Sequence, residues 1–268
     1  MSHPMALRFR FELDATPDIQ AWGEQGQMEL HWFGLTSGRF WIETPVGEVL
    51  RYTAAIQELW SCPFDYVDYQ VARLFEDLQS CISAALEPVP EDIGLLVSDP
   101  VWLEKLNRWI EEEIDEAELD QRWDLYESAV SWWQHRMFDT LYLKHGPLFS
   151  IWRINDVVHF RWVTGNNEAD GVSVFLMPTG EITVSIADFK AAAFGFCEEV
   201  LFSMSERVRQ IQMVGWNRTD CSVDVDVLVS EQRKREDKFH ALKNHVLATD
   251  WNYIRTQLAL LVAHVSRT

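Results

Sequence analysis

The sequence predicts an α+β fold, in which two small antiparallel β-meanders are each followed by helices. Apolar and polar residues alternate in two separate blocks, 7–52 and 149–186, as expected for strands that bury one face. Apolar residues at helical spacing follow each block. The order strands, helices, strands, helices is typical of α+β folds and differs from the regular strand–helix alternation of parallel sheets.

The first meander is predicted from three apolar–polar segments and the turns between them. Residues 7–13 alternate strictly, and residues 28–33 alternate more weakly. Turn-forming residues at 34–38 separate these from the predicted strands 39–43 and 46–52. We therefore expect an antiparallel meander in which Pro45 and Gly47 make the last turn.

Three helical stretches are predicted between the two meanders. The first begins near Asp65 and ends before Pro88, and its apolar positions are Val67, Val71, Leu74, Leu78, Ile82 and Ala85. Asp99-Pro100 is a favourable helix start, since it offers a capping carboxylate and proline at the first helical position. Two apolar stripes follow it: Trp102, Leu106, Trp109 or Ile110, and Ile114, and then Leu119, Trp123, Tyr126, Val130, Trp133 and Met137. The stripes lose phase near residues 115–118, so we expect either a helical hairpin or one long kinked helix.

The second meander is predicted at residues 149–154, 157–163, 172–177 and 181–186. Asp188 is expected to cap a helix with apolar positions Phe189, Ala193, Phe196, Val200 and Met204, and a last helix carries Trp251, Ile254, Leu258, Leu261 and Val265. The halves 1–145 and 146–268 thus each predict a meander plus helices, as two units or one compact unit.

Composition predicts a soluble cytoplasmic protein. Hydrophobic residues make up 47% of the 268-residue chain, enough to build a core without metals or disulfides. The four cysteines are far apart and form no C-x-x-C pair, as expected for reduced thiols. No signal peptide is indicated at the N-terminus, and no apolar run is long enough to predict a membrane span.

Negative charge is concentrated in the predicted central helices. Residues 87–127 contain 14 acidic and 3 basic residues, a net charge of −11 within a chain of net charge −19. Residues 188–268, by contrast, contain 11 acidic and 11 basic residues. Such a field repels nucleic acids and anionic membranes and attracts basic proteins. We therefore expect a basic protein partner, and neither nucleic acid nor membrane binding.

No short catalytic or metal-binding motif is present. G-x-S-x-G, H-E-x-x-H, Walker and Rossmann patterns are all missing. The i,i+4 acid pairs Glu112/Glu116 and Asp120/Asp124 have no histidine at matching spacing, so a solvated acidic face is favoured over a metal site. Asp224 and Asp226 flank Val225 in an apparently extended stretch and are expected to face solvent. No metal and no cofactor is predicted.

Adjacent tryptophans leave two interpretations open for Trp132. Neighbouring helical residues point about 100° apart, so Trp132 and Trp133 cannot share one face fully. Either the helix is buried on two sides, or Trp132 is partly exposed beside the acidic residues. An exposed tryptophan within a charged rim has the composition of a protein-binding patch.

The N-terminal region resembles an uncharacterised family of bacterial proteins. The similarity rests on F-x-L, W-G and L-H-W-F-G-L-T-x-G-x-x-W-I motifs, which stand here at residues 11–13, 22–23 and 30–42. It is specific over roughly the first fifty residues and looser beyond, where Asp188-Phe189, Val200 and Arg207-Val208 resemble a helix of that family. The family has no settled biochemical activity. Its members look like the immunity-type proteins that accompany secreted toxins, so the resemblance implies bacterial origin and an inhibitory role.

These observations lead us to expect an immunity or inhibitor protein and not an enzyme. It would bind a basic toxin domain, such as a nuclease, through its acidic helical surface. The predicted partner-binding residues are Glu111, Glu112, Glu113, Asp115, Glu116, Glu118, Asp120 and, as an aromatic anchor, Trp132. Two alternatives stay open: an enzyme without a short motif, using His31 and Glu29 from one side of a strand, and a structural protein whose Trp-rich helices form a homo-oligomer.

Overall fold

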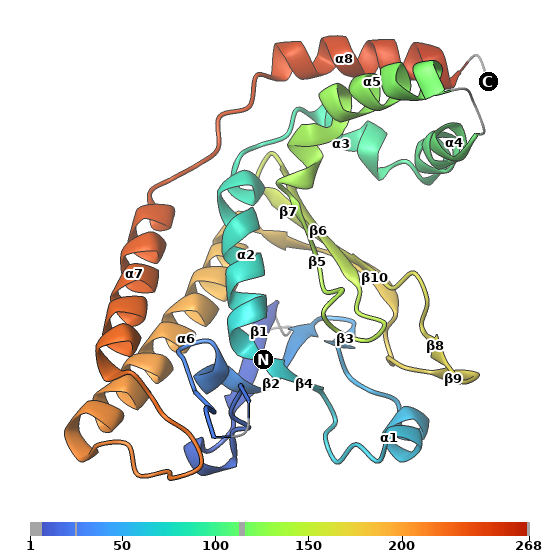
Figure 1. Cartoon of the computed structure of the whole chain (residues 1–268). Helices are drawn as coiled ribbons and strands as arrows, with labels where there is room; N and C mark the ends of the chain where they lie inside the picture. The colour runs from blue at the N-terminus through green and yellow to red at the C-terminus, as the bar shows by residue number, and fades with distance from the viewer. Residues whose placement is uncertain (1–6, 25, 113–115, 267–268) are drawn as a thin grey trace, which may run out of the picture.

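The structure is a computed structural model, and it describes residues 7–24, 26–112 and 116–266 (Figure 1). Its larger strands are β1 (Arg8–Leu13), β2 (Ser37–Thr44), β3 (Gly47–Val49), β4 (Val67–Gln70), β5 (Met137–Asp139), β6 (Leu148–Ile154), β7 (Val157–Val163) and β10 (Thr179–Ser185). A small hairpin is formed by β8 (Glu168–Ala169) and β9 (Val172–Ser173). The helices are α1 (Ala54–Trp60), α2 (Val71–Leu86), α3 (Glu91–Ser98), α4 (Pro100–Glu111), α5 (Glu116–Gln134), α6 (Ile186–Val214), α7 (Val225–Lys243) and α8 (Trp251–Val265), with short 3₁₀ turns η1 (Thr16–Asp18) and η2 (Gly34–Thr36).

The predicted α+β class is confirmed, with two small antiparallel four-stranded sheets. In the first sheet, β2 pairs with β1, β3 and β4. Alternate residues of β2 are buried, as the period of two requires. In the second sheet the order is β10-β7-β6-β5. Asn155, at φ 53°, makes the tight turn between β6 and β7.

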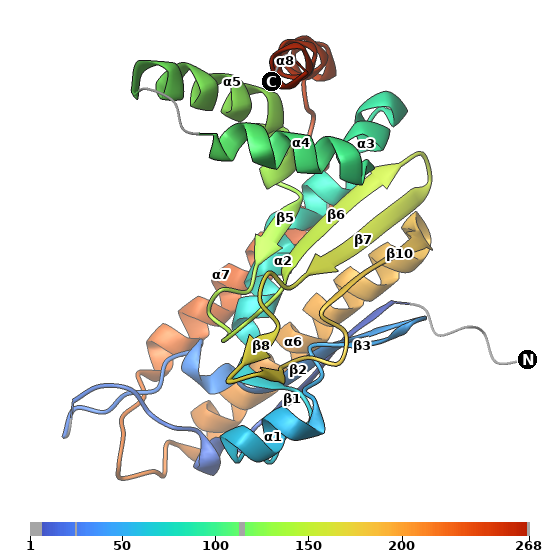
Figure 2. The same ribbon diagram turned by 90° about the vertical axis from the view of Figure 1, so that its right-hand side faces the viewer.

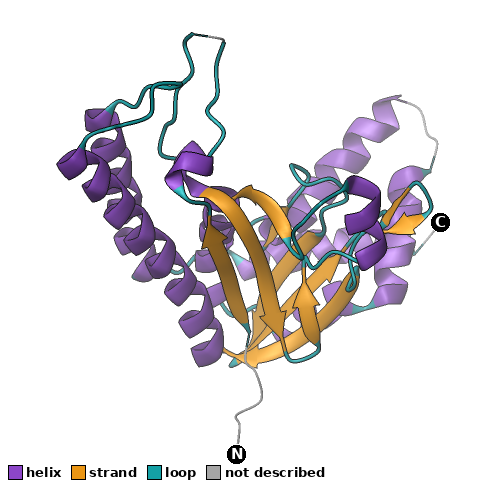
Figure 3. Cartoon of the chain, turned by 90° about the horizontal axis from the view of Figure 1, so that it is seen from below, coloured by secondary structure: helices purple, strands orange, loops and turns teal. Residues whose placement is uncertain are grey.

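The two sheets and the long helices α2, α6 and α7 share one hydrophobic core (Figures 1 and 3). Phe9 of β1 shows the arrangement, since its ring centroid lies 5.9 Å from that of Phe160 in β7 and 5.8 Å from that of Phe196 in α6. Residues from both sides of position 145 therefore contribute to the same core.

A second, separate core holds together the helices α3, α4, α5 and α8. These four helices lie together at one end of the molecule, above the second sheet (Figure 2). Their core is rich in tryptophan: Trp102, Trp109 and Trp132 of these helices, and Trp152 of the underlying strand β6, are all at most 7% exposed. We call this layer the helical cap.

A buried ion pair anchors the helical cap to the body. Arg136, just after the end of α5, is fully buried, and its guanidinium lies 2.6 Å from the carboxylate of Glu87 after α2. The same carboxylate accepts hydrogen bonds from the backbone N–H and the hydroxyl of Thr249. The guanidinium also lies over the rings of Trp132 and Trp251. Three segments of the chain therefore meet at this ion pair: the end of α2, the end of α5 and the start of α8.

Several sequence-based predictions were wrong in detail. Residues 28–33 form no strand, because Glu29 makes only isolated bridges, to Trp22 and to Ser222. Val67 belongs to strand β4 and not to the following helix, which begins at Val71. Only residues 172–173 of the predicted strand 172–177 are in a strand. Met137, which the apolar stripe had placed in a helix, lies in strand β5, and helices α1, α3 and α7 had no prediction.

Two helix starts also differ from the predictions. Ser185, and not Asp188, is the N-cap of α6: its hydroxyl accepts from the Asp188 N–H and in turn donates to the Asp188 carboxylate. The stretch 224–226 is not extended, because Asp224 caps helix α7 by accepting from the Val227 N–H.

No described helix is long and apolar enough to cross a membrane.

The central helices agree with the prediction of a break. Asp99 caps α4 by accepting from the Val101 N–H at 2.9 Å, as Asp99-Pro100 predicted. Helix α4 ends at Glu111 and α5 begins at Glu116, so the predicted loss of phase separates two helices. The residues between them include 113–115, which lie outside the described part of the chain.

A candidate protein-binding site on the helical cap

Packing within the helical cap decides which side chains of α4 and α5 face solvent. Trp102, Leu106 and Trp109 of α4 are buried, as their spacing predicted, and Ala129, Val130 and Trp132 of α5 are buried with them. Because charged residues occupy the remaining helical positions, the outer surfaces of both helices carry carboxylates. We call these the acidic face: Glu111, Glu112, Glu118, Asp120, Asp124 and Glu127, all exposed.

The acidic face contains four of the eight residues predicted to bind a partner. Glu111, Glu112, Glu118 and Asp120 are exposed. Glu113 and Asp115 lie outside the described residues. Glu116 is the first residue of α5, and its side chain also lies outside the described part of the structure.

Arg122 partly neutralises this face from within. Its side chain is only 7% exposed, and its guanidinium carbon lies 4.6 Å from the centroid of the Trp109 ring. It donates to the Trp109 carbonyl, to Glu112 at 3.3 Å and to Glu118 at 3.5 Å. The predicted acidic helical surface is therefore partly neutralised at these two glutamates, which share one internal cation.

The other four carboxylates of the acidic face have no such partner. Within residues 7–24, 26–112 and 116–266, no cation forms an ion pair with Glu111, Asp120, Asp124 or Glu127. Arg108 is nearby in α4, but it pairs with Glu104 at 2.9 Å on its own helix. The acidic face thus keeps an excess of negative charge to which an external cation can bind.

Trp132 is not a surface anchor. It is 3% exposed, and its indole N–H donates to the Ala129 carbonyl at 2.9 Å. Its ring centroid lies 5.5 Å from that of Trp133 and 5.2 Å from that of Trp251. Of the two interpretations of this residue, burial on two sides is therefore confirmed, because Trp132 packs against Trp251 of α8 while Trp133 packs against Trp152 of β6.

Trp123 is the exposed aromatic residue on α5, although the stripe pattern had placed it in the core. It is 47% exposed, and its ring meets Tyr126 edge to face at 5.5 Å. The interior position belongs instead to Arg122, which is followed at intervals of seven by the buried residues Ala129 and Arg136. That interval was visible in the sequence, but two of its three members are arginines, which a purely apolar pattern omits.

A pocket of about 570 Å³ lies where the C-terminal ends of α4 and α8 meet, beside the acidic face. Its lining residues are Lys105, Arg108, Trp109, Glu111, Glu112, Val265 and Ser266. Trp109 and Val265 give it an apolar floor, and both belong to the core of the helical cap. Charges of both signs surround it.

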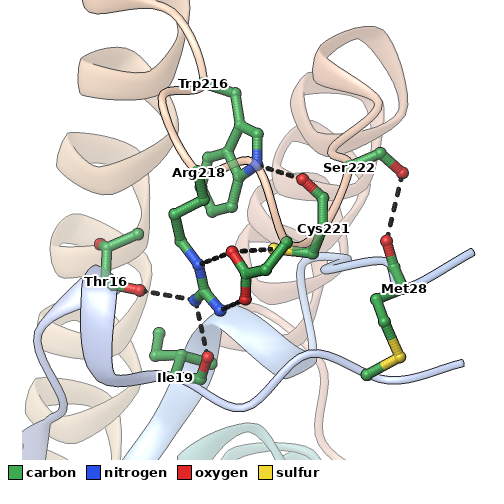
Figure 4. Close-up of polar contacts among 8 residues, drawn as sticks. Thr16, Ile19, Met28, Trp216, Arg218, Cys221 and Ser222 are labelled. Atoms are coloured by element: carbon green, nitrogen blue, oxygen red, sulfur yellow. Dashed lines mark hydrogen bonds and ion pairs between the residues drawn. The ribbon is translucent and has the colours of Figure 1, made fainter. Parts of the chain in front are cut away.

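A second pocket, of about 700 Å³, gathers the residues considered for catalysis. Glu29, His31, Asp224 and Asp226 all line it, although no strand joins the first two. Its wall is the α6–α7 loop, which Arg218 ties to the N-terminal segment by donating to the carbonyls of Thr16 at 3.0 Å and Ile19 at 2.6 Å (Figure 4).

The imidazole in this pocket is committed to other contacts. His31 accepts at Nδ1 from the Gly34 N–H at 3.3 Å, and its ring lies against Trp22. Among the described residues, none of the carboxylates bonds to it. The described chain also holds no group of three or more His, Cys, Asp or Glu side chains suited to a metal ion.

Comparison with known proteins identifies a family without a known activity. A family model described as "Family of unknown function (DUF5984)" matches residues 8–257, which is most of the chain. No curated protein and no solved structure matches the chain. The relationship therefore supports the resemblance to an uncharacterised family and assigns no activity to it.

Proposed function

Because the chain belongs to the DUF5984 family of unknown function, we propose its role from its own surface: it is an immunity-type inhibitor that binds a basic toxin protein through the acidic face of the helical cap. A toxin that acts on nucleic acid fits this role best, because a nuclease must be basic where it grips phosphate. Carboxylates on a rigid helical layer would occupy that basic surface in place of the substrate.

One observation carries the proposal. Several of the acids that the sequence concentrates at residues 87–127 form internal ion pairs, but four exposed carboxylates on α4 and α5 have no cation partner in the described chain. They lie on a cap with its own tryptophan-rich core, which holds them in fixed positions. Preorganised charge of this kind speeds encounter with an oppositely charged partner to about 10⁸ M⁻¹s⁻¹ or more at low salt.

The test is affinity capture from a lysate of the source organism at low salt, followed by elution in a salt gradient. We expect a basic protein to elute at moderate salt and to lose its toxic activity when the inhibitor is added back. A charge-reversed variant, E111K/D120K/D124K/E127K, should not retain it. These four positions are chosen because reversing Glu112 or Glu118 would also leave the buried Arg122 without its partners.

A matched variant controls for the change in net charge. Glu24, Glu58, Glu168 and Glu199 are exposed and lie away from the helical cap. Reversing these four to Lys changes the net charge by the same amount and should leave capture intact. Equal loss of capture in both variants, or equal retention, would remove the acidic face from the account.

An enzyme that uses His31 is the second candidate, favoured by the pocket that gathers Glu29, His31, Asp224 and Asp226. A general base needs hydrogen-bond contact with the group that orients it, and His31 contacts a backbone N–H and aromatic rings instead. The binding proposal therefore takes precedence.

A homo-oligomer, the third candidate, would show as a molecular mass that rises with protein concentration.

A further inference from the structure

Resting on the proposed function, we infer how the partner is held: it places an arginine or lysine side chain on the exposed ring of Trp123, between the carboxylates of Asp120, Asp124 and Glu127. The ring would supply a cation–π contact, and the carboxylates would supply charge around it. Trp123 then takes the anchoring role that the sequence had given to Trp132.

The spacing along α5 brings these four residues together. Asp120 and Glu127 stand three residues before and four residues after Trp123, and Asp124 is one turn beyond Asp120. Residues three and four apart are neighbours on a helix surface, so the indole lies within a stripe of carboxylates. All four side chains are exposed, and none of the three acids has an ion pair among the residues that the structure describes.

The chain itself shows how such a site is used. Seven tryptophan rings carry a guanidinium or ammonium group within 6 Å of their centroids: Trp32, Trp60, Trp109, Trp132, Trp152, Trp216 and Trp251. The pair most similar to the proposed site is Arg122 on Trp109, because two carboxylates, Glu112 and Glu118, flank the same guanidinium. Trp123 and its acids repeat this combination of ring and carboxylates on the outer surface of α5, the helix that carries Arg122.

Trp123 has an open position for a cation, and the other strongly exposed tryptophan does not. Trp22 is 41% exposed, but the rings of His31 and Phe33 pack against it at 4.9 and 5.8 Å. Among the described residues, the aromatic ring that packs against Trp123 is that of Tyr126, which meets it edge to face, and no cation lies over the Trp123 ring. Charge complementarity therefore selects a basic side chain from outside the molecule as the occupant.

The experiment uses octa-arginine as the probe, titrated at low salt into the full chain labelled with 5-fluorotryptophan. We expect one ¹⁹F resonance to shift most, and the variant W123F, which lacks that indole, identifies it. W123A should weaken octa-arginine binding about three- to tenfold, the range expected for one cation–π contact. W22A, which removes the other exposed indole, should leave the affinity unchanged.

The outcomes separate this inference from the proposed function. If D120N/D124N/E127N weakens octa-arginine binding but W123A does not, the acidic face binds cations without the ring, and the inference about Trp123 is overturned alone. The inference about Trp123 is also overturned if the resonance that shifts most is not that of Trp123, or if wild-type protein does not bind octa-arginine. The proposed function is judged by capture of the toxin, which does not depend on octa-arginine.

Discussion

At the scale of single residues, this protein buries arginines where its sequence pattern suggests apolar side chains. Arg122 of α5 and Arg136, two residues after the end of that helix, occupy interior positions because tryptophan rings, backbone carbonyls and carboxylates together replace the water that a guanidinium loses. Because Arg122 faces the interior of the helical cap, the rotation of α5 leaves Trp123 exposed and Trp132 buried. Side-chain type alone could not reveal these positions, because each arginine also depends on a partner from another segment: Trp109 of α4 for Arg122 and Glu87 for Arg136.

Arg136 is predicted to be essential for stability. R136M removes the cation and leaves Glu87 buried with Thr249 as its remaining hydrogen-bond partner, so the free energy of unfolding should fall by about 3–5 kcal/mol. Denaturant titration measures this loss. The double variant E87Q/R136M removes both charges and should recover part of it; no recovery would show that packing, and not charge, stabilises this junction.

Asp77 predicts a dependence of stability on pH. Burial raises the pKa of Asp77 to about 6, against the opposite influence of Tyr142 and Arg73. The folded state thus favours the protonated carboxyl, and stability should fall as pH rises from about 4 to about 6, where the folded protein releases its proton. D77N removes this penalty.

Near neutral pH, D77N should therefore raise the free energy of unfolding by about 1–2 kcal/mol, less than the whole pKa shift implies because the side chain is half-buried. Thermal unfolding at a series of pH values checks both the gain and the flatter profile. D237N, on the exposed side of α7, controls for the loss of one negative charge. A D77N profile parallel to that of the wild type would contradict this account.

At the scale of elements, the sequence is most informative where a local signal coincides with a long periodic segment. Residues 8–13, the start of α4 at Asp99-Pro100 and the apolar positions of α6 and α8 agree with the structure. The failures occur where long-range pairing decides. Residues 67–70 read as helix but pair with β2, and residues 28–31 bridge to Ser222, almost two hundred positions away.

Asp224 tests the helix start that the sequence missed. D224A should lower the free energy of unfolding by about 1 kcal/mol, because the Val227 N–H loses its acceptor at the beginning of α7. D226A, in the first turn of the same helix, removes an equal charge without removing the cap. Equal destabilisation of the two variants in denaturant titration would indicate that charge at the helix start, and not the capping bond, matters.

At the scale of the whole molecule, the chain separates a mixed sheet-and-helix body from a helical cap that carries about half of its net negative charge (Figure 1). Charge counting located the acidic helices, because exposure of charged residues needs no knowledge of tertiary contacts. It could not show that Arg122 offsets two of the acids, or that α8, from the far end of the chain, closes the cap over Trp132.

The central claim is that the acidic face is the surface that meets the partner. Carboxylate footprinting tests it most directly: the captured complex and the free protein are labelled with a carbodiimide and an amine, and each modified site is quantified by mass spectrometry. We predict that Glu111, Asp120, Asp124 and Glu127 are labelled less in the complex, while Glu58 and Glu168 are labelled equally in both. Protection confined to the body, with the four cap carboxylates fully labelled in the complex, would contradict the account.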